Sequence, residues 1–280
     1  MRTLFAVVFL LLSLPLGSLA ALYTVTKVDE RLYAAIVDPD GPVASNAFIV
    51  VMPTSVLVAG AHFTPAASAE ITRIIAGITP LPLRYVVLTH HHQGKGIAGF
   101  GFPPTVEIIL SAESFAKIRE EKQPLSNRLI AFEKVMTLSG GKQTILLMQM
   151  DQGHSRGNLA VYLPDQAVLF TSDLMFNDEA GSMTDGSPRG WVQDLLQLEK
   201  MVVTKVVPGR GNVTGSKGIR RFRLFLQDFF TEVLSHLERG ESAAETVARF
   251  GLPPEKMPPH FFRVRQENIE WAWRELREQR

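Results

Sequence analysis

Three consecutive histidines lie just after a short apolar segment of the chain. Residues 85–88 read Y-V-V-L, which predicts a buried strand, and residues 89–99 read T-H-H-H-Q-G-K-G-I-A-G. Successive side chains of an extended backbone point to opposite sides, so His90 and His92 project one way and His91 the other. Two imidazoles on one side of a strand end suggest a zinc site, and three surface histidines in a polar loop are the alternative.

Three more polar residues follow predicted strands. His154 comes after the apolar residues 143–150, Asp173 after 167–171, and Arg210 after 203–207. Each is weak evidence alone, since His154 could be a loop histidine and Asp173 a turn residue. Because active sites at a sheet edge draw side chains from several strand ends, we expect the four segments to meet in one site.

The remaining pattern predicts strands alternating with helices. Strands are expected at 32–37, 47–52, 55–59, 85–88, 106–110, 143–150, 159–163, 167–171 and 203–207. Helices are expected at 65–76, with Thr64 as N-cap and Gly77 as the stop, and at 113–121, 191–202, 219–239 and 268–279. This order indicates a layered α/β protein with sheets inside and helices outside.

Composition limits the types of metal ligand and of partner that this chain can have. The chain has 280 residues, of which 46% are hydrophobic and 20% charged, enough for a large globular core. It has no cysteine, so any metal ligands must be His, Asp or Glu. Basic and acidic residues nearly balance, which argues against a nucleic-acid partner and leaves a small-molecule substrate as the expectation.

Residues 1–20 have the pattern of a secretory signal. A cation at Arg2 precedes an apolar run from 4 to 16, and small residues end the segment at Ala20. Cleavage after Ala20 predicts a periplasmic or secreted domain of residues 21–280 without a stable membrane span; an uncleaved anchor helix is the alternative. Protein partners are not indicated.

Four segments resemble motifs of the metallo-β-lactamase superfamily. They read T-H-H-H-Q-G-K-G, G-H-S-R-G-N-L-A-V-Y-L, L-F-T-S-D-L-M-F and V-V-P-G-R-G, and they span about residues 46–211. Gly190-Trp191 and V-V-P-G also resemble the exported branch called quinoprotein relay system metallohydrolases. The resemblance implies an αββα sandwich, with two mixed β-sheets flanked by helices and a C-terminal helical part at 216–280.

The resemblance also implies a set of metal ligands. His90, His92 and His154 match the three histidines of the first metal site, and Asp173 matches the aspartate that bridges two metals. Three imidazoles and one water form a tetrahedral catalytic zinc site. One zinc ion is therefore the expected cofactor.

The matching residues of a second metal site are missing. Gly94, Lys95 and Arg210 occupy the positions of an aspartate and two histidines, and Gly60 replaces an aspartate common at the end of its strand. Our hypothesis is that Lys95 or Arg210 pairs with Asp173 and replaces the second metal electrostatically.

Two functions remain open at this point. In the first, zinc lowers the pKa of its water to about 7, and hydroxide attacks an ester, thioester, lactone or amide. Asp173 then orients the water, and Lys95 or Arg210 stabilises the developing oxyanion. In the second, the chain is an inactive accessory or binding protein on the same scaffold, since the aspartate that normally holds the nucleophile is lost at position 94.

Other polar residues received a less specific interpretation. His62 lies just past the predicted strand 55–59, at the edge where the site is expected; an ordinary loop histidine is favoured over a site residue. His91 is expected to face away from the metal, with ligation as the alternative, while His236 and His260 are expected to be structural or surface residues. Residues 177–189, rich in glycine and polar side chains, are a candidate lid over the pocket.

Restoring the missing residues tests the lost second site. The triple variant Gly94→Asp, Lys95→His, Arg210→His should bind two zinc ions per chain instead of one, because it regains three donors beside Asp173. Elemental analysis of the purified variant measures this, and an unchanged zinc-to-protein ratio would contradict the hypothesis.

Overall fold

A computed structural model of the chain describes residues 21–91, 100–122 and 126–279. The predicted signal segment lies outside the described residues, as do His92, Gly94 and Lys95. The structure therefore tests the predicted site through His90, His154, Asp173 and Arg210.

Within the described ranges, seven strands form a first mixed sheet whose spatial order follows the chain. The first four strands pair antiparallel, and parallel pairing joins the fourth strand to the last three. The strands are β1 (Tyr23–Asp29), β2 (Leu32–Val37), β3 (Ala47–Val51), β4 (Val56–Gly60), β5 (Leu83–Leu88), β6 (Glu107–Ser111) and β7 (Leu129–Phe132).

The later strands form a second mixed sheet, five strands in the part of the chain that is described, in the order β12-β11-β10-β9-β8. The pair β11 and β12 is parallel and the others are antiparallel. The strands are β8 (Val135–Gly140), β9 (Gln143–Gln149), β10 (Leu159–Leu163), β11 (Val168–Phe176) and β12 (Lys205–Arg210).

The two sheets pack face to face with helices outside. Alternation along β3 shows the arrangement: Phe48 and Val50 face the other sheet, and Ala47 and Ile49 face helix α1 (Pro65–Ile78). Phe48 stacks on Phe170 of β11 at a ring-centroid distance of 5.5 Å. Layers of helix, sheet, sheet and helix confirm the predicted αββα sandwich.

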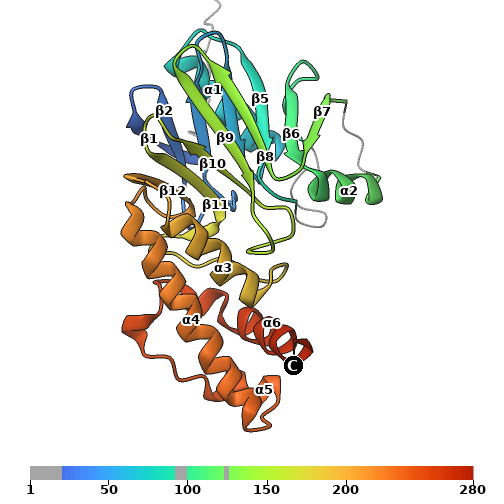
Figure 1. The fold of residues 1–280 in the computed structure, drawn as a ribbon, viewed down its shortest axis with the longest axis vertical. Helices are drawn as coiled ribbons and strands as arrows, with labels where there is room; N and C mark the ends of the chain where they lie inside the picture. The colour runs from blue at the N-terminus through green and yellow to red at the C-terminus, as the bar shows by residue number, and fades with distance from the viewer. Residues whose placement is uncertain (1–20, 92–99, 123–125, 280) are drawn as a thin grey trace, which may run out of the picture.

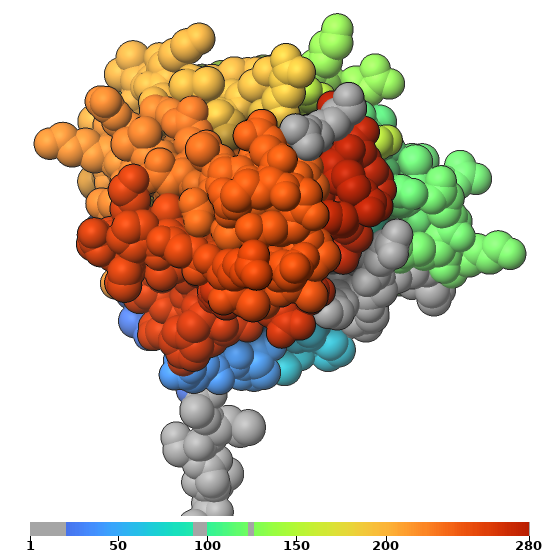
Figure 2. Space-filling view, turned by 90° about the horizontal axis from the view of Figure 1, so that it is seen from below, coloured from blue at the N-terminus to red at the C-terminus, as the bar shows by residue number. Residues whose placement is uncertain are grey.

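Helices of the C-terminal half gather at one end of the molecule and cover the second sheet (Figure 1). They are α3 (Pro188–Glu199), α4 (Ser216–Glu238), α5 (Ala243–Arg249) and α6 (Arg265–Glu278), with short 3₁₀ turns at Pro254–Lys256 and Phe261–Arg263. Viewed from this end, the surface consists largely of these helices (Figure 2). Among the described helices, α4 included, none combines the length and apolar character that a membrane crossing needs.

The observed elements differ from the predicted ones at several ends. The first helix passes through Gly77 to Ile78, and the Thr79 N–H closes it by donating to the Ile75 carbonyl at 2.9 Å. Gly77 has an ordinary helical backbone, so its presence did not end the helix. Helix α2 (Ala112–Glu120) begins one residue early, with Ser111 as N-cap.

Strands β1, β7 and β8 had no specific prediction. Strand β8 alternates exposed and half-buried residues, and β7 has four residues, none of them buried. Both lie at the edge of their sheets, where long apolar runs are not needed. Their sequences therefore lack the signal that identified the central strands.

Asn46 connects the two sheets through its side chain. Its Oδ1 accepts a hydrogen bond from the Val37 N–H at 2.9 Å, and its Nδ2 donates to the carbonyls of Pro208 and Gly211 at 2.9 Å each. Its backbone N–H also donates to the Gly209 carbonyl at 2.7 Å. Asn46 is fully buried, and its hydrogen bonds to Val37 and Pro208 are buried too, so these two groups have no access to water as an alternative partner.

Replacing this side chain should destabilise the whole domain. Asn46→Ala leaves one buried N–H and two carbonyls without their partner, which should lower the free energy of unfolding by about 2–4 kcal/mol. Urea denaturation followed by circular dichroism measures the change. The exposed Asn212 provides a control, because Asn212→Ala should stay within about 0.5 kcal/mol of the wild type; equal effects of both substitutions would contradict the prediction.

Candidate metal centre

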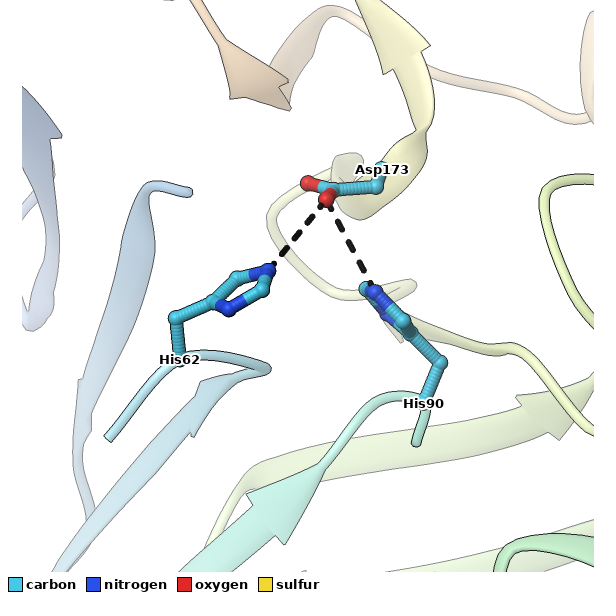
Figure 3. A group of neighbouring side chains, drawn as sticks. All are labelled: His62, His90 and Asp173. Carbon is cyan, nitrogen blue, oxygen red and sulfur yellow. Dashed lines mark ion pairs between the residues drawn. The ribbon is translucent and has the colours of Figure 1, made fainter. Parts of the chain in front are cut away.

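Four polar side chains meet at one edge of the sandwich. His62 lies two residues past β4, His90 lies two residues past β5, and His154 lies in the loop between β9 and β10. Asp173 belongs to β11 of the other sheet. Figure 3 shows His62 and His90 approaching the same carboxylate oxygen of Asp173 from different loops.

The three imidazoles surround one oxygen atom. The distances from Asp173 Oδ2 to the Nε2 atoms of His62, His90 and His154 are 3.8, 3.7 and 3.8 Å. The rings of His90 and His154 lie edge to face, with centroids 4.9 Å apart. The second carboxylate oxygen, Oδ1, accepts a hydrogen bond from the Ser45 hydroxyl at 2.6 Å.

These neighbours determine the charge of the carboxylate. Burial by itself raises the pKa of Asp173, but the hydrogen bond from His62 and the positive charges of His90, His154 and His62 outweigh it. The pKa of Asp173 therefore lies well below its usual range. The carboxylate is an ionised oxygen donor, which suits a divalent cation.

Asp173 lies inside β11, whereas the sequence predicted that it follows a strand ending at 171. The strand continues to Phe176, but its pairing with β12 shifts register on both sides of Ser172. Ser172 has a left-handed backbone with φ of 47°, which turns the following side chain toward the site. The Ser172 hydroxyl lies 2.8 Å from the Thr89 hydroxyl, so this irregularity is tied to the end of β5.

Arg210 is the last residue of β12 and lines the same pocket, which has a volume of about 340 Å³. In the described part of the chain Arg210 forms no ion pair with Asp173, and Lys95, the other cation expected to pair with it, lies outside the described residues. The neighbours of the carboxylate are instead the histidines and Ser45. A Cβ atom at Gly209 would collide with Asp173 Oδ1, so this glycine permits the close approach of the two strands.

Helix α3 positions the loop that carries His154. The Trp191 ring packs edge to face on the His154 ring with centroids 5.2 Å apart, and its Nε1 donates to the Leu174 carbonyl at 2.8 Å. Fully buried Asp194 accepts a hydrogen bond from the Asp151 N–H at 3.1 Å. Burial raises the pKa of Asp194 to about 6, although hydrogen bonds from the backbone of Asp151 and Gly153 oppose the change.

The segment expected to form a lid is a wall of the pocket. Ser182, Thr184 and Asp185 line it. Fully buried Asn268 of α6 accepts a hydrogen bond from the Met183 N–H at 2.9 Å and donates to the Gly181 carbonyl at 3.0 Å. The C-terminal helices thus hold this wall in place.

His62 belongs to this cluster, although the sequence favoured an ordinary loop histidine over a site residue at this position. That preference is wrong, because its ligand atom and those of His90 and Asp173 all lie within 4.8 Å of one another. A signal was available: β4 and β5 pair in parallel, so residues just past both strands meet at the same edge. His91 faces elsewhere, with its Nε2 2.9 Å from Glu121 Oε2.

The end of β4 differs from the family pattern for a steric reason. A Cβ atom at Gly60 would lie 2.8 Å from the Phe63 ring. Phe63 is buried and packs edge to face with Phe102 at 5.2 Å. The ring therefore occupies the space that an aspartate side chain at position 60 would need.

Known proteins with similar sequences are hydrolases. The chain is 28% identical over 138 residues to a hydroxyacylglutathione hydrolase from Thermosynechococcus vestitus, covering 48% of this chain and 52% of that protein. It is 25% identical over 152 residues to the acyl-coenzyme A thioesterase MBLAC2 from Bos taurus, covering 49% and 52%. The chain thus spans about half the length of these relatives, and no family model matches it.

Solved structures with the same architecture are metallo-β-lactamases. The enzyme from Pontibacter korlensis superposes with a TM-score of 0.63 at 20% identity, covering 74% of this chain and 99% of that one. FIM-1 from Pseudomonas aeruginosa in its mono-zinc form superposes with a TM-score of 0.61 at 18% identity, covering 74% and 95%. The chain is a protein of the metallo-β-lactamase fold, as its motifs predicted.

The buried Asp194 predicts a dependence of stability on pH. Its pKa of about 6 in the folded protein exceeds the ordinary value of 3.8, so the folded state retains a proton that the unfolded chain releases between these values. The wild type should therefore lose stability as pH rises from about 4 to 6, by on the order of 3 kcal/mol from this residue. Asp194→Asn carries no such proton and lacks this loss.

Urea unfolding of the metal-free proteins at a series of pH values tests this. The stability of Asp194→Asn relative to the wild type should increase between pH 4 and 7. The same measurement on Asp165→Asn, at an exposed aspartate, should give a curve parallel to the wild type. Parallel curves for Asp194→Asn as well would rule out the assigned cause.

Proposed function

We propose that this protein is an exported, zinc-dependent hydrolase that uses one zinc ion to cleave acyl thioesters. The observation that carries the proposal is the convergence of three imidazole nitrogens on one ionised carboxylate oxygen, at 3.7–3.8 Å. Export is supported by the apolar segment at residues 4–16 after Arg2, and it implies a periplasmic or secreted enzyme.

The donor set fits zinc. Zn–N and Zn–O bonds of about 2.0–2.2 Å place two donors of a tetrahedral site roughly 3.4 Å apart. The observed separations exceed this by only a few tenths of an ångström. Candidate donors are His90, His154 and Asp173, together with His92, which the motif assigns and which lies outside the described residues. Three of these would hold the ion and leave its fourth position for water.

The chain's own groups have separable roles in hydrolysis. When bound, zinc supplies Lewis acidity and a water nucleophile that is deprotonated near neutral pH. The Asp173 carboxylate, whose pKa lies well below its usual range, orients the attacking water, while the Ser45 hydroxyl fixes its other oxygen. Arg210 lines the pocket with a permanent positive charge, which suits a carbonyl oxygen that becomes negative during attack.

Thioesters are favoured among acyl substrates by the relatives. Hydroxyacylglutathione and acyl-coenzyme A, the compounds in the names of two similar proteins, both carry an acyl group on sulfur. Thiolate leaving groups depart without prior protonation, so their expulsion needs no general acid in the site. The metallo-β-lactamase fold alone does not select a substrate. The preference for thioesters therefore comes from the relatives of similar sequence.

Turnover of a thioester panel tests the proposal. The wild type should hydrolyse at least one of an acyl-glutathione, an acyl-coenzyme A and a simple thioester, lose activity with a chelator, and regain it with zinc. His90→Ala should lower kcat/KM by more than about 100-fold, because removal of a ligand should exceed the 10–100-fold effect of groups behind the ligands.

His260→Gln is the matched control, since His260 pairs with Glu179 at 3.1 Å and has no place in the metal cluster. It should retain activity within about threefold. Activity that survives both chelation and His90→Ala would refute the zinc hydrolase. A zinc-loaded protein that is inert toward thioester, lactone, ester and amide substrates would support the accessory or binding function instead.

A further inference from the structure

His62 is close to the metal cluster without belonging to any of the four motifs. It lies in the short loop between β4 and α1, where Ala61 and Phe63 beside it are buried. This loop has little freedom, because Thr64 caps α1 by accepting a hydrogen bond from the Ala67 N–H at 3.3 Å. The backbone on both sides of His62 is therefore fixed, and its ring is directed at Asp173 (Figure 3).

We infer that His62 is a ligand of the metal, and that its Nε2 joins His90 Nε2 and Asp173 Oδ2 in holding the ion. This inference rests on the proposed metal-dependent function and specifies its donor set. The three ligand atoms lie within 4.8 Å of one another, the arrangement that a single ion can bridge. Two imidazoles and one carboxylate also form the ligand set of known catalytic zinc sites.

The distances place His62 on equal terms with His90 and His154. Its Nε2 is 3.8 Å from Asp173 Oδ2, compared with 3.7 Å for His90 and 3.8 Å for His154. The His62 and His90 rings lie edge to face with centroids 6.0 Å apart, so both nitrogens can point at one position. By its distance to the carboxylate oxygen, the unassigned histidine is equivalent to the two that the motifs assign.

His62 also supplies one donor where three of the second site are missing. The chain has Gly94, Lys95 and Arg210 where relatives of this fold have an aspartate and two histidines. Among the described residues of the pocket, His62 restores one imidazole on the Asp173 side, whereas Arg210 cannot donate a lone pair. The centre is thus rearranged by a histidine from another loop.

The absence of cysteine from this chain allows a direct test of coordination. His62→Cys places a single thiol at the position in question, and bound cobalt(II) then shows a thiolate-to-metal charge-transfer band in the near ultraviolet only if residue 62 is a ligand. His260→Cys places the only thiol away from the cluster and should show no such band. Circular dichroism confirms that each variant is folded.

Zinc affinity provides a second measurement. His62→Gln removes the ligand with similar volume and should weaken zinc binding by more than about tenfold in competition with a chromophoric chelator. His260→Gln should leave it within twofold. These readouts do not depend on catalytic turnover.

The outcomes separate this inference from the proposed function. A charge-transfer band in His62→Cys together with weaker zinc binding in His62→Gln supports coordination by His62. Wild-type protein that binds one zinc, with no band in His62→Cys and unchanged affinity in His62→Gln, would overturn the inference and leave the hydrolase intact. Wild-type protein that binds neither zinc nor cobalt would overturn both.

Discussion

An ionised carboxylate that is removed from water costs several kcal/mol unless positive or hydrogen-bonding groups surround it. Asp173 is such a group, and it is 5% exposed. Its two oxygens have different partners, with the Ser45 hydroxyl on Oδ1 and three imidazoles around Oδ2. These partners come from both sheets. The elements that carry them are held together partly because the negative charge of Asp173 needs all of them as neighbours.

That requirement explains why the two sheets meet so closely at the site. Gly209 lets β12 pass directly beside Asp173, and Asn46 joins the same strand to β2 through hydrogen bonds with buried backbone groups. The C-terminal helices also support the site. Trp191 packs on His154, and Asn268 accepts a hydrogen bond from the Met183 N–H in the pocket wall. The C-terminal helices are therefore part of the framework of the site as well as a cover for the second sheet.

Much of this arrangement could be predicted from the sequence. The central strands have continuous apolar runs, and polar residues at their ends identified His90 and His154. Asp173 was predicted at the site but not inside β11, because the left-handed backbone of Ser172 leaves no hydrophobic pattern to detect. His62 was placed at the correct edge but was not favoured as a site residue, because a lone histidine after a strand becomes specific only when the parallel pairing of β4 and β5 is known.

The cation predicted to pair with Asp173 was either Lys95 or Arg210. Arg210 forms no ion pair with it among the described residues, where the neighbours of the carboxylate include three histidines. The positions of charged residues in the sequence do not show which of several nearby side chains contacts the Asp173 carboxylate, since that depends on the direction of each side chain. His92 and Lys95 keep their predicted roles as predictions.

The Phe63 ring that fills the space beside Gly60 limits which side chains position 60 can accept. A Cβ atom there would lie 2.8 Å from the ring, so an aspartate at position 60 would force Phe63 out of its present place. A change at the end of β4 would therefore disturb the buried aromatic contact between Phe63 and Phe102 as well as the site.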